Sequence, residues 1–88
     1  MRRSQDFRLQ RVGGQDLLVP LGPRVKDANA LIVLNAAGRQ VWELLAEDRT
    51  AEELAAALAR RFEADPARVL ADVRSFLDDL GRKGLLEP

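Results

Sequence analysis

The sequence contains no cysteine and no histidine among its 88 residues. Without cysteine the chain cannot form a disulfide or a thiolate zinc site, and without histidine it lacks the usual general base near neutral pH. The side chains left for chemistry are carboxylates, arginines, two lysines and two serines. This inventory argues against an enzyme, and we expect neither a cofactor nor a metal ion.

The chain also lacks a charge imbalance and a long apolar run. Fourteen basic residues balance 14 acidic ones, so no strong positive field attracts nucleic acid. The longest apolar segment, residues 30–34 (ALIVL), is far shorter than the roughly 20 residues of a membrane-spanning helix. The N-terminal MRRSQDFRLQ has no apolar signal core. We therefore expect a cytoplasmic protein that binds neither nucleic acid nor membrane.

The N-terminal third has the pattern of a small sheet. Residues 7–12 (FRLQRV) and 16–21 (DLLVPL) flank Gly13-Gly14-Gln15, which is typical of a β-hairpin. Residues 22–29 predict a loop, and residues 30–34 predict a third strand. Because this third strand is apolar throughout, both of its faces should be covered, by the domain itself or by a molecule that binds later.

The remaining sequence predicts three amphipathic helices. The first follows an Asn35 N-cap and runs to about residue 47, the second starts at Thr50 with Glu53 completing a capping box, and the third starts at Asp65 with Pro66. Glycine at position 84 should end the third helix. Their apolar stripes contain Val41, Trp42, Leu44 and Leu45, then Leu54, Leu58 and Phe62, then Val69, Val73, Phe76, Leu77 and Leu80.

These elements predict an α+β fold in which three helices cover one side of a three-stranded antiparallel sheet. Residues 1–6 are expected to be a flexible N-terminus, and residues 7–88 a single domain. Three strands cannot close into a barrel, so at least one sheet edge exposes unpaired backbone N–H and C=O groups. The third helix carries Leu70 and Leu77 beside its core-facing residues. With the edge of the third strand it would form a groove suited to an added peptide strand.

Three segments together resemble the PqqD-like family, whose members are precursor-peptide recognition elements of ribosomally made, modified peptides. The segments are LNAAGRQVWELL from residue 34, TAEELAAALARRF from residue 50, and DVRSFLDDLGRKGLL from residue 72. The resemblance implies a winged-helix-like domain without an active site. Such a domain binds the leader part of a precursor peptide and presents it to a tailoring enzyme, often a radical SAM maturase.

The resemblance also implies which positions contact the leader. The third strand would supply backbone hydrogen bonds through Ala30, Leu31, Ile32, Val33 and Leu34. The third helix would supply side-chain contacts through Leu70, Val73, Arg74 and Leu77. On this interpretation Val73→Glu abolishes leader binding and leaves the fold intact, and Ile32→Pro removes a donor from the peptide ladder.

A winged-helix DNA-binding regulator is the main alternative, because it has the same order of elements and would use the third helix for recognition. Between residues 68 and 83 four basic side chains are matched by three acidic ones. A helix that reads a DNA groove would be more uniformly basic, so the charge pattern favours peptide binding.

Overall fold

The computed structural model describes residues 1–22 and 32–87. Its main sheet is antiparallel and contains β2 (Phe7–Val12), β3 (Gln15–Pro20) and β4 (Ile32–Leu34), in the spatial order β2-β3-β4. The two-residue turn at Gly13 and Gly14 has φ angles of 58° and 80°, which only glycine adopts without strain at both positions. The hairpin prediction is confirmed. The predicted loop, except residue 22, and residues 30 and 31 of the predicted strand lie outside the described residues.

Three helices follow the sheet, as predicted: α1 (Ala36–Leu44), α2 (Ala51–Phe62) and α3 (Pro66–Arg82). Each begins at its predicted cap. The Asn35 side chain accepts from the Gly38 N–H, Thr50 and Glu53 form the reciprocal capping box, and Asp65 caps α3 ahead of its proline. Helix α1 ends about three residues earlier than predicted, at Leu44. The α+β, winged-helix-like architecture is confirmed.

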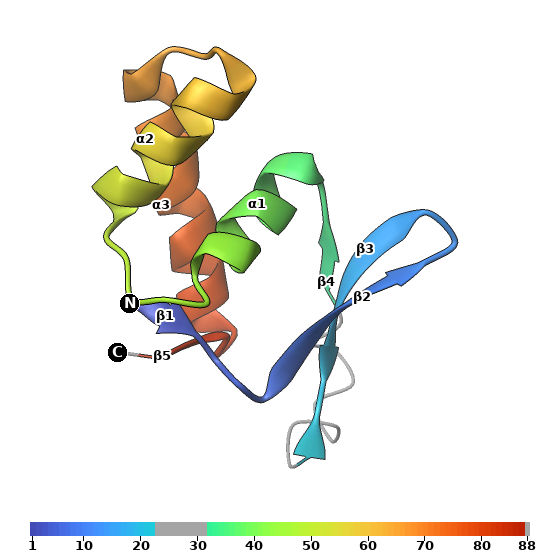
Figure 1. Ribbon diagram of the computed structural model, residues 1–88. Helices are drawn as coiled ribbons and strands as arrows, with labels where there is room; N and C mark the ends of the chain where they lie inside the picture. The colour runs from blue at the N-terminus through green and yellow to red at the C-terminus, as the bar shows by residue number, and fades with distance from the viewer. Residues whose placement is uncertain (23–31, 88) are drawn as a thin grey trace.

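The hydrophobic core lies between the helices and one face of the sheet (Figure 1). Strands β2 and β3 place alternate residues on this face, and Leu18 at its centre has no exposed surface. Trp42 of α1 is only 1% exposed and anchors the helical layer. The fully buried side chains include Leu18, Val41, Trp42, Leu45, Leu54, Leu80 and Leu85. No helix within residues 1–22 and 32–87 is long and apolar enough to cross a membrane.

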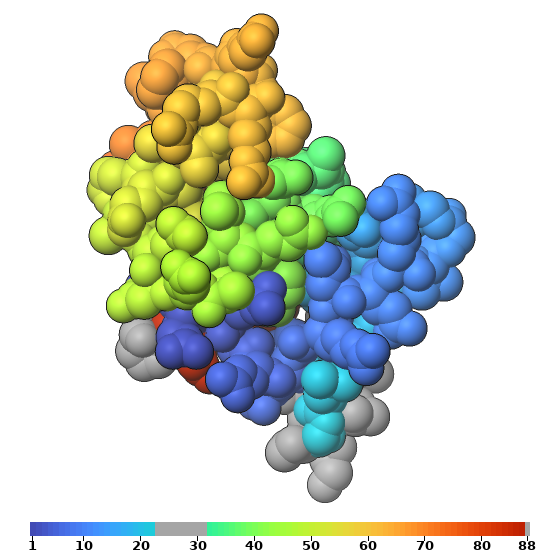
Figure 2. All heavy atoms as spheres, viewed as in Figure 1, coloured from blue at the N-terminus to red at the C-terminus, as the bar shows by residue number. Residues whose placement is uncertain are grey.

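The N-terminus differs from the prediction of a flexible segment. Residues Arg2–Arg3 form β1, which pairs in antiparallel fashion with β5 (Leu86–Glu87). The Arg3 N–H donates to the Leu45 carbonyl over 2.9 Å, so backbone bonds tie the segment to the domain. Figure 2 shows the dark-blue N-terminal atoms lying against the green helical layer. This pairing could not be predicted, because two-residue strands show no periodicity and the partners lie at opposite ends of the sequence.

The Arg3 side chain offers a test of this second sheet. Its Nη1 donates to the Trp42 carbonyl over 3.2 Å, and its guanidinium carbon lies 5.8 Å from the centroid of the Trp42 ring. Losing both contacts in Arg3→Ala should lower the free energy of unfolding by about 1 kcal/mol, or roughly 4 to 8 °C in Tm. Urea titration followed by circular dichroism measures the change.

Arg2→Ala is the matched control for this experiment. Among the described residues its guanidinium forms an exposed ion pair with Glu87, at 3.6 Å, so its removal should cost less than about 0.5 kcal/mol. Equal stability of the Arg3→Ala variant and the unsubstituted protein would show that the Arg3 side chain does not hold Trp42 in solution.

Candidate functional site

Strand β4 is the outermost strand of the main sheet as described, with β3 on one side only. The Val33 side chain is 60% exposed, whereas Leu34 is buried at 6% and Ile32 is half-buried. This alternation places Ile32 and Leu34 on the core face and Val33 on the outer face. The predicted third strand is thus confirmed over its last three residues, although only one of its faces is covered by the domain.

The sheet register shows which backbone groups point to the open edge. In a tight turn of the type at Gly13-Gly14, the Gln15 N–H bonds the Val12 carbonyl, so these residues form a hydrogen-bonded pair. Hydrogen-bonded and non-hydrogen-bonded pairs then alternate along the hairpin. Odd-numbered residues of β3 therefore direct their backbone groups to β2, and Asp16 and Leu18 direct theirs to β4.

The partners of these two residues on β4 are Leu34 and Ile32, and Val33 lies opposite Leu17. We infer that the backbone N–H and C=O groups of Ile32 and Leu34 form hydrogen bonds with β3. Val33 then presents its N–H and C=O to the open edge. The expectation that Ile32 donates to an added peptide is wrong on this geometry, because its N–H faces the opposite way.

Helix α3 approaches the end of β4 through Phe76. A Cβ atom built on Gly38 would lie 3.4 Å from both Phe76 Cζ and Leu34 Cδ2, and 3.2 Å from Asn35 Oδ1. A larger residue at position 38 would therefore crowd these three side chains. Phe76 lies on α3, and Leu34 is the last residue of β4, so the strand edge and the helix meet at this point.

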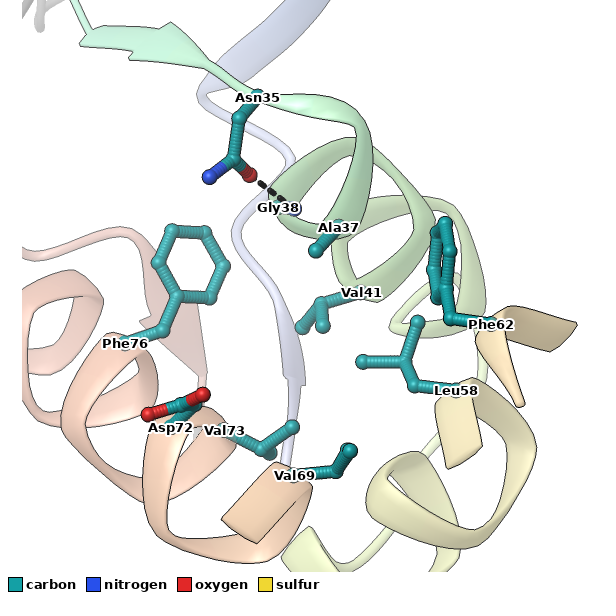
Figure 3. A pocket seen from close by; sticks show the side chains of 10 residues that line it. All are labelled: Asn35, Ala37, Gly38, Val41, Leu58, Phe62, Val69, Asp72, Val73 and Phe76. Carbon is teal, nitrogen blue, oxygen red and sulfur yellow. Dashed lines mark hydrogen bonds between the residues drawn. The ribbon is translucent and has the colours of Figure 1, made fainter. Parts of the chain in front are cut away.

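A cavity of about 350 Å³ opens beside this meeting point. Figure 3 shows that α1, α2 and α3 each contribute side chains that point into it. Its rim includes Phe62, which is 48% exposed at the end of α2. The lining residues are Asn35, Ala37, Gly38, Val41, Leu58, Phe62, Val69, Asp72, Val73 and Phe76. Apart from Asn35 and Asp72 the lining is apolar, and the cavity begins where β4 ends.

The predicted helix contacts do not all lie on this side of α3. Val73 lines the floor of the cavity but is only 3% exposed, and Leu77 is 6% exposed, so both belong to the core. Arg74 Nη2 donates to Glu52 Oε1 of α2 over 2.9 Å, and Leu70 precedes Arg74 by four residues on the same face. Arg74 therefore faces the start of α2, and neither residue lines the cavity. The contact role of the full predicted set stays a prediction.

The residues of α3 that do face the cavity are Val69, Asp72 and Phe76, together with the buried Val73. Sequence reasoning assigned Val69 and Phe76 to the core alone and gave Asp72 no individual role. A signal was present, since positions 69, 72, 73 and 76 have the spacing of one helical face. Which side of α3 stays uncovered depends on where α2 packs, and the packing position of α2 was not predicted.

Two of the three arginines of α3 form ion pairs in the described part of the chain. Arg74 pairs with Glu52, and Arg82 pairs with Asp79. The Glu52 pKa is lowered, first by a hydrogen bond from its own backbone N–H and then by the Arg74 guanidinium. Guanidinium groups held by carboxylates are poorly placed to contact DNA phosphates, which agrees with the charge argument against a DNA-binding helix. No group of three potential metal ligands occurs within the described ranges.

A family model for coenzyme PQQ synthesis protein D (PqqD) matches residues 19–86. The chain belongs to the PqqD family. This match covers β4, all three helices and the cavity between them. It confirms the resemblance derived from the three sequence segments. No relative is found among curated proteins.

Two solved structures resemble this PqqD-family chain over 99% of its length. One is TbiB1 in complex with the TbiA(beta) leader peptide, with a TM-score of 0.77, 29% identity and 95% of that chain covered. The other is the solution structure of the PqqD truncation of Methylobacterium extorquens PqqCD, with a TM-score of 0.75, 25% identity and 87% coverage. The second protein is described as a functional, stand-alone recognition element for ribosomally synthesised and post-translationally modified peptides. These comparisons give no support to the DNA-binding alternative.

Proposed function

We propose that this PqqD-family chain binds the leader segment of a ribosomally made precursor peptide and presents it to a tailoring enzyme, such as a radical SAM maturase. The leader adds a strand to the open edge of β4 and continues into the cavity beside α3. The chain acts by binding and carries out no catalytic step of its own. The cytoplasm, where a ribosomal precursor is made, is the expected place of action.

One observation carries this proposal: the outermost strand β4 ends at a lined cavity, in a fold shared with TbiB1, which was solved with a leader peptide. An exposed strand edge in a monomer invites pairing with another chain unless it is covered. Strand addition uses such an edge for main-chain hydrogen bonds and neighbouring pockets for selectivity.

Magnitudes show why the cavity is needed as well as the strand edge. Val33 offers one donor and one acceptor, and each hydrogen bond contributes about 1 kcal/mol net. Ordering a flexible peptide costs roughly 2 to 5 kcal/mol, before the entropy of association is counted. Burial of one large apolar side chain adds about 1.5 to 3 kcal/mol. Affinity therefore depends on side chains held near Phe76, and the backbone ladder mainly fixes the peptide register.

A peptide selection followed by NMR tests this proposal. Immobilised protein is used to select binders from an mRNA-displayed library of random 12-residue peptides, and an enriched peptide is titrated into ¹⁵N-labelled protein. Amide signals of Val33, Asp72 and Phe76 should shift in parallel, because these residues border the edge and the cavity. The Arg74 amide serves as the internal comparison, since its side chain faces α2.

Two results would contradict the proposal. If no peptide is enriched from the library, the domain does not bind peptides by adding them as a strand to the edge of β4. Shifts confined to α2 and to the side of α3 that carries Arg74 would show that peptides bind on that side of the helix. The predicted contacts of Leu70 and Arg74 imply binding there.

A further inference from the structure

The cavity beside α3 contains one feature that strand addition does not explain, a carboxylate at a mostly apolar mouth. Asp72 lies one turn before Phe76 on α3, and its side chain is drawn at the cavity in Figure 3. The Asp72 side chain is exposed, and its carboxylate forms no hydrogen bond or ion pair within residues 1–22 and 32–87. Its neighbours in the lining, Val69, Val73 and Phe76, are apolar and satisfy none of its acceptor capacity.

Three other carboxylates on the helices have ion-pair partners, whereas Asp78 of α3 is, like Asp72, without one in the described part of the chain but lies outside the cavity lining. Glu43 accepts from Arg39 over 2.9 Å, Glu52 from Arg74 over 2.9 Å, and Asp79 pairs with Arg82. Arg68 precedes Asp72 by four residues on α3, but no basic side chain of residues 1–22 and 32–87 forms an ion pair with Asp72. Arg61, near the end of α2, hydrogen-bonds Gln40 of α1 instead.

The second polar group at the mouth is already in use. Asn35 Oδ1 accepts the Gly38 N–H over 2.7 Å, which fixes the orientation of the amide. Its nitrogen is a donor and lies on the side of Phe76 in Figure 3. Asp72 is therefore the acceptor in the lining that remains without a partner within the described ranges.

Resting on the proposed function, we infer that Asp72 is a specificity-determining residue that selects leader peptides with a lysine or arginine at the cavity mouth. A peptide strand along β4 directs every second side chain to the core face, where Leu34 and Phe76 lie. A basic side chain there packs its aliphatic stem on the apolar lining and brings its cation to the carboxylate. The cavity of about 350 Å³ is at the small end of ligand pockets, which suits peptide side chains.

The charge of the whole chain supports a local selection of this kind. Because 14 basic and 14 acidic residues balance, the protein exerts no general attraction on cationic peptides. A preference for a basic residue at one peptide position must then arise from a specific carboxylate. Such a contact at the rim discriminates between peptides more than it adds affinity, and it weakens as salt is raised.

The test compares the unsubstituted protein with Asp72→Asn in the same mRNA-display selection of random 12-residue peptides. The unsubstituted protein should enrich lysine or arginine at one fixed position, and Asp72→Asn should lose that enrichment. For one selected peptide and its glutamine-substituted version, fluorescence anisotropy gives the four affinities of a double-mutant cycle. Asp72→Asn should weaken the basic peptide about fivefold, the upper range for an exposed ion pair. Binding of the glutamine peptide should not change.

Asp78→Asn is the matched control, because it removes the same charge from the same helix outside the cavity lining. An equal loss for Asp78→Asn, or selected peptides without a basic preference, would overturn the role of Asp72. If these peptides still shift the Val33 amide, the proposed function stands and only this inference fails. Failure to enrich any peptide would overturn both.

Discussion

Val73→Glu is expected to unfold the domain. The Val73 side chain is 3% exposed and packs in the core with Leu77 and Leu80 of the same helix. Burying an unpaired carboxylate costs several kcal/mol, and a domain of this size has a total stability of only about 5 to 15 kcal/mol. Loss of the cooperative thermal transition and collapse of amide dispersion in the NMR spectrum would report the unfolding.

Ser75→Glu is the control for this substitution, because it adds the same carboxylate to an exposed position of α3. Its Tm should stay within about 3 °C of the unsubstituted value, since exposed substitutions rarely exceed about 0.5 kcal/mol. A folded Val73→Glu variant with an unchanged Tm would contradict the described packing of α3. It would also restore the sequence-based expectation that this substitution affects binding alone.

The features that the sequence predicted correctly are those specified by neighbouring residues. Each of three such features depends on residues within three positions of one another. They are the Thr50–Glu53 capping box, the Asp65-Pro66 start of α3 and the Gly13-Gly14 turn. Apolar periodicity then identified one buried face for each helix. Local signals of this kind were sufficient for the element order and for the α+β class.

The features that the sequence did not predict depend on contacts between distant segments. Helix α3 has apolar residues over a wide arc, so periodicity alone could not tell which side of the helix the rest of the domain would leave uncovered. That choice follows from the position of α2, which the Arg74–Glu52 pair links to α3 across 22 residues of sequence. The β1–β5 pairing joins both ends of the chain, and no local pattern specifies it.

The direction of backbone groups on β4 is an intermediate case. The hairpin was predicted, but its turn is one residue shorter than expected, because Gln15 already belongs to β3. The turn sets the alternation of hydrogen-bonded pairs in the sheet. The pairing of β3 with β4, however, requires the register Leu17 opposite Val33. That register became visible only in the structure. It moves the outward-facing backbone position by one residue, from Ile32 to Val33.

This one-residue difference leads to the second large effect, expected for Val33→Pro. The substitution removes the N–H that faces the open edge and places a proline ring where the peptide strand would approach, while the bonds from β4 to β3 remain. The fold should therefore persist, since proline is tolerated in edge strands whose N–H faces outward. Peptide binding should weaken by about tenfold or more, corresponding to at least 1.4 kcal/mol. Calorimetric titration with a library-selected peptide, together with a thermal melt, measures both quantities.

Ile32→Pro provides the matched comparison, one position earlier in the same strand. Its missing N–H would leave the backbone carbonyl of the fully buried Leu18 without its partner. An unsatisfied buried group of this kind costs about 1 to 3 kcal/mol, so the Tm should fall by several degrees, at about 4 to 8 °C per kcal/mol. The two proline variants thus separate binding from stability. Val33→Pro should bind the peptide more weakly and stay folded, whereas Ile32→Pro should mainly lower the stability of the fold. The reverse order of effects would show that the strand register, and with it the donor presented to the peptide, is shifted by one residue.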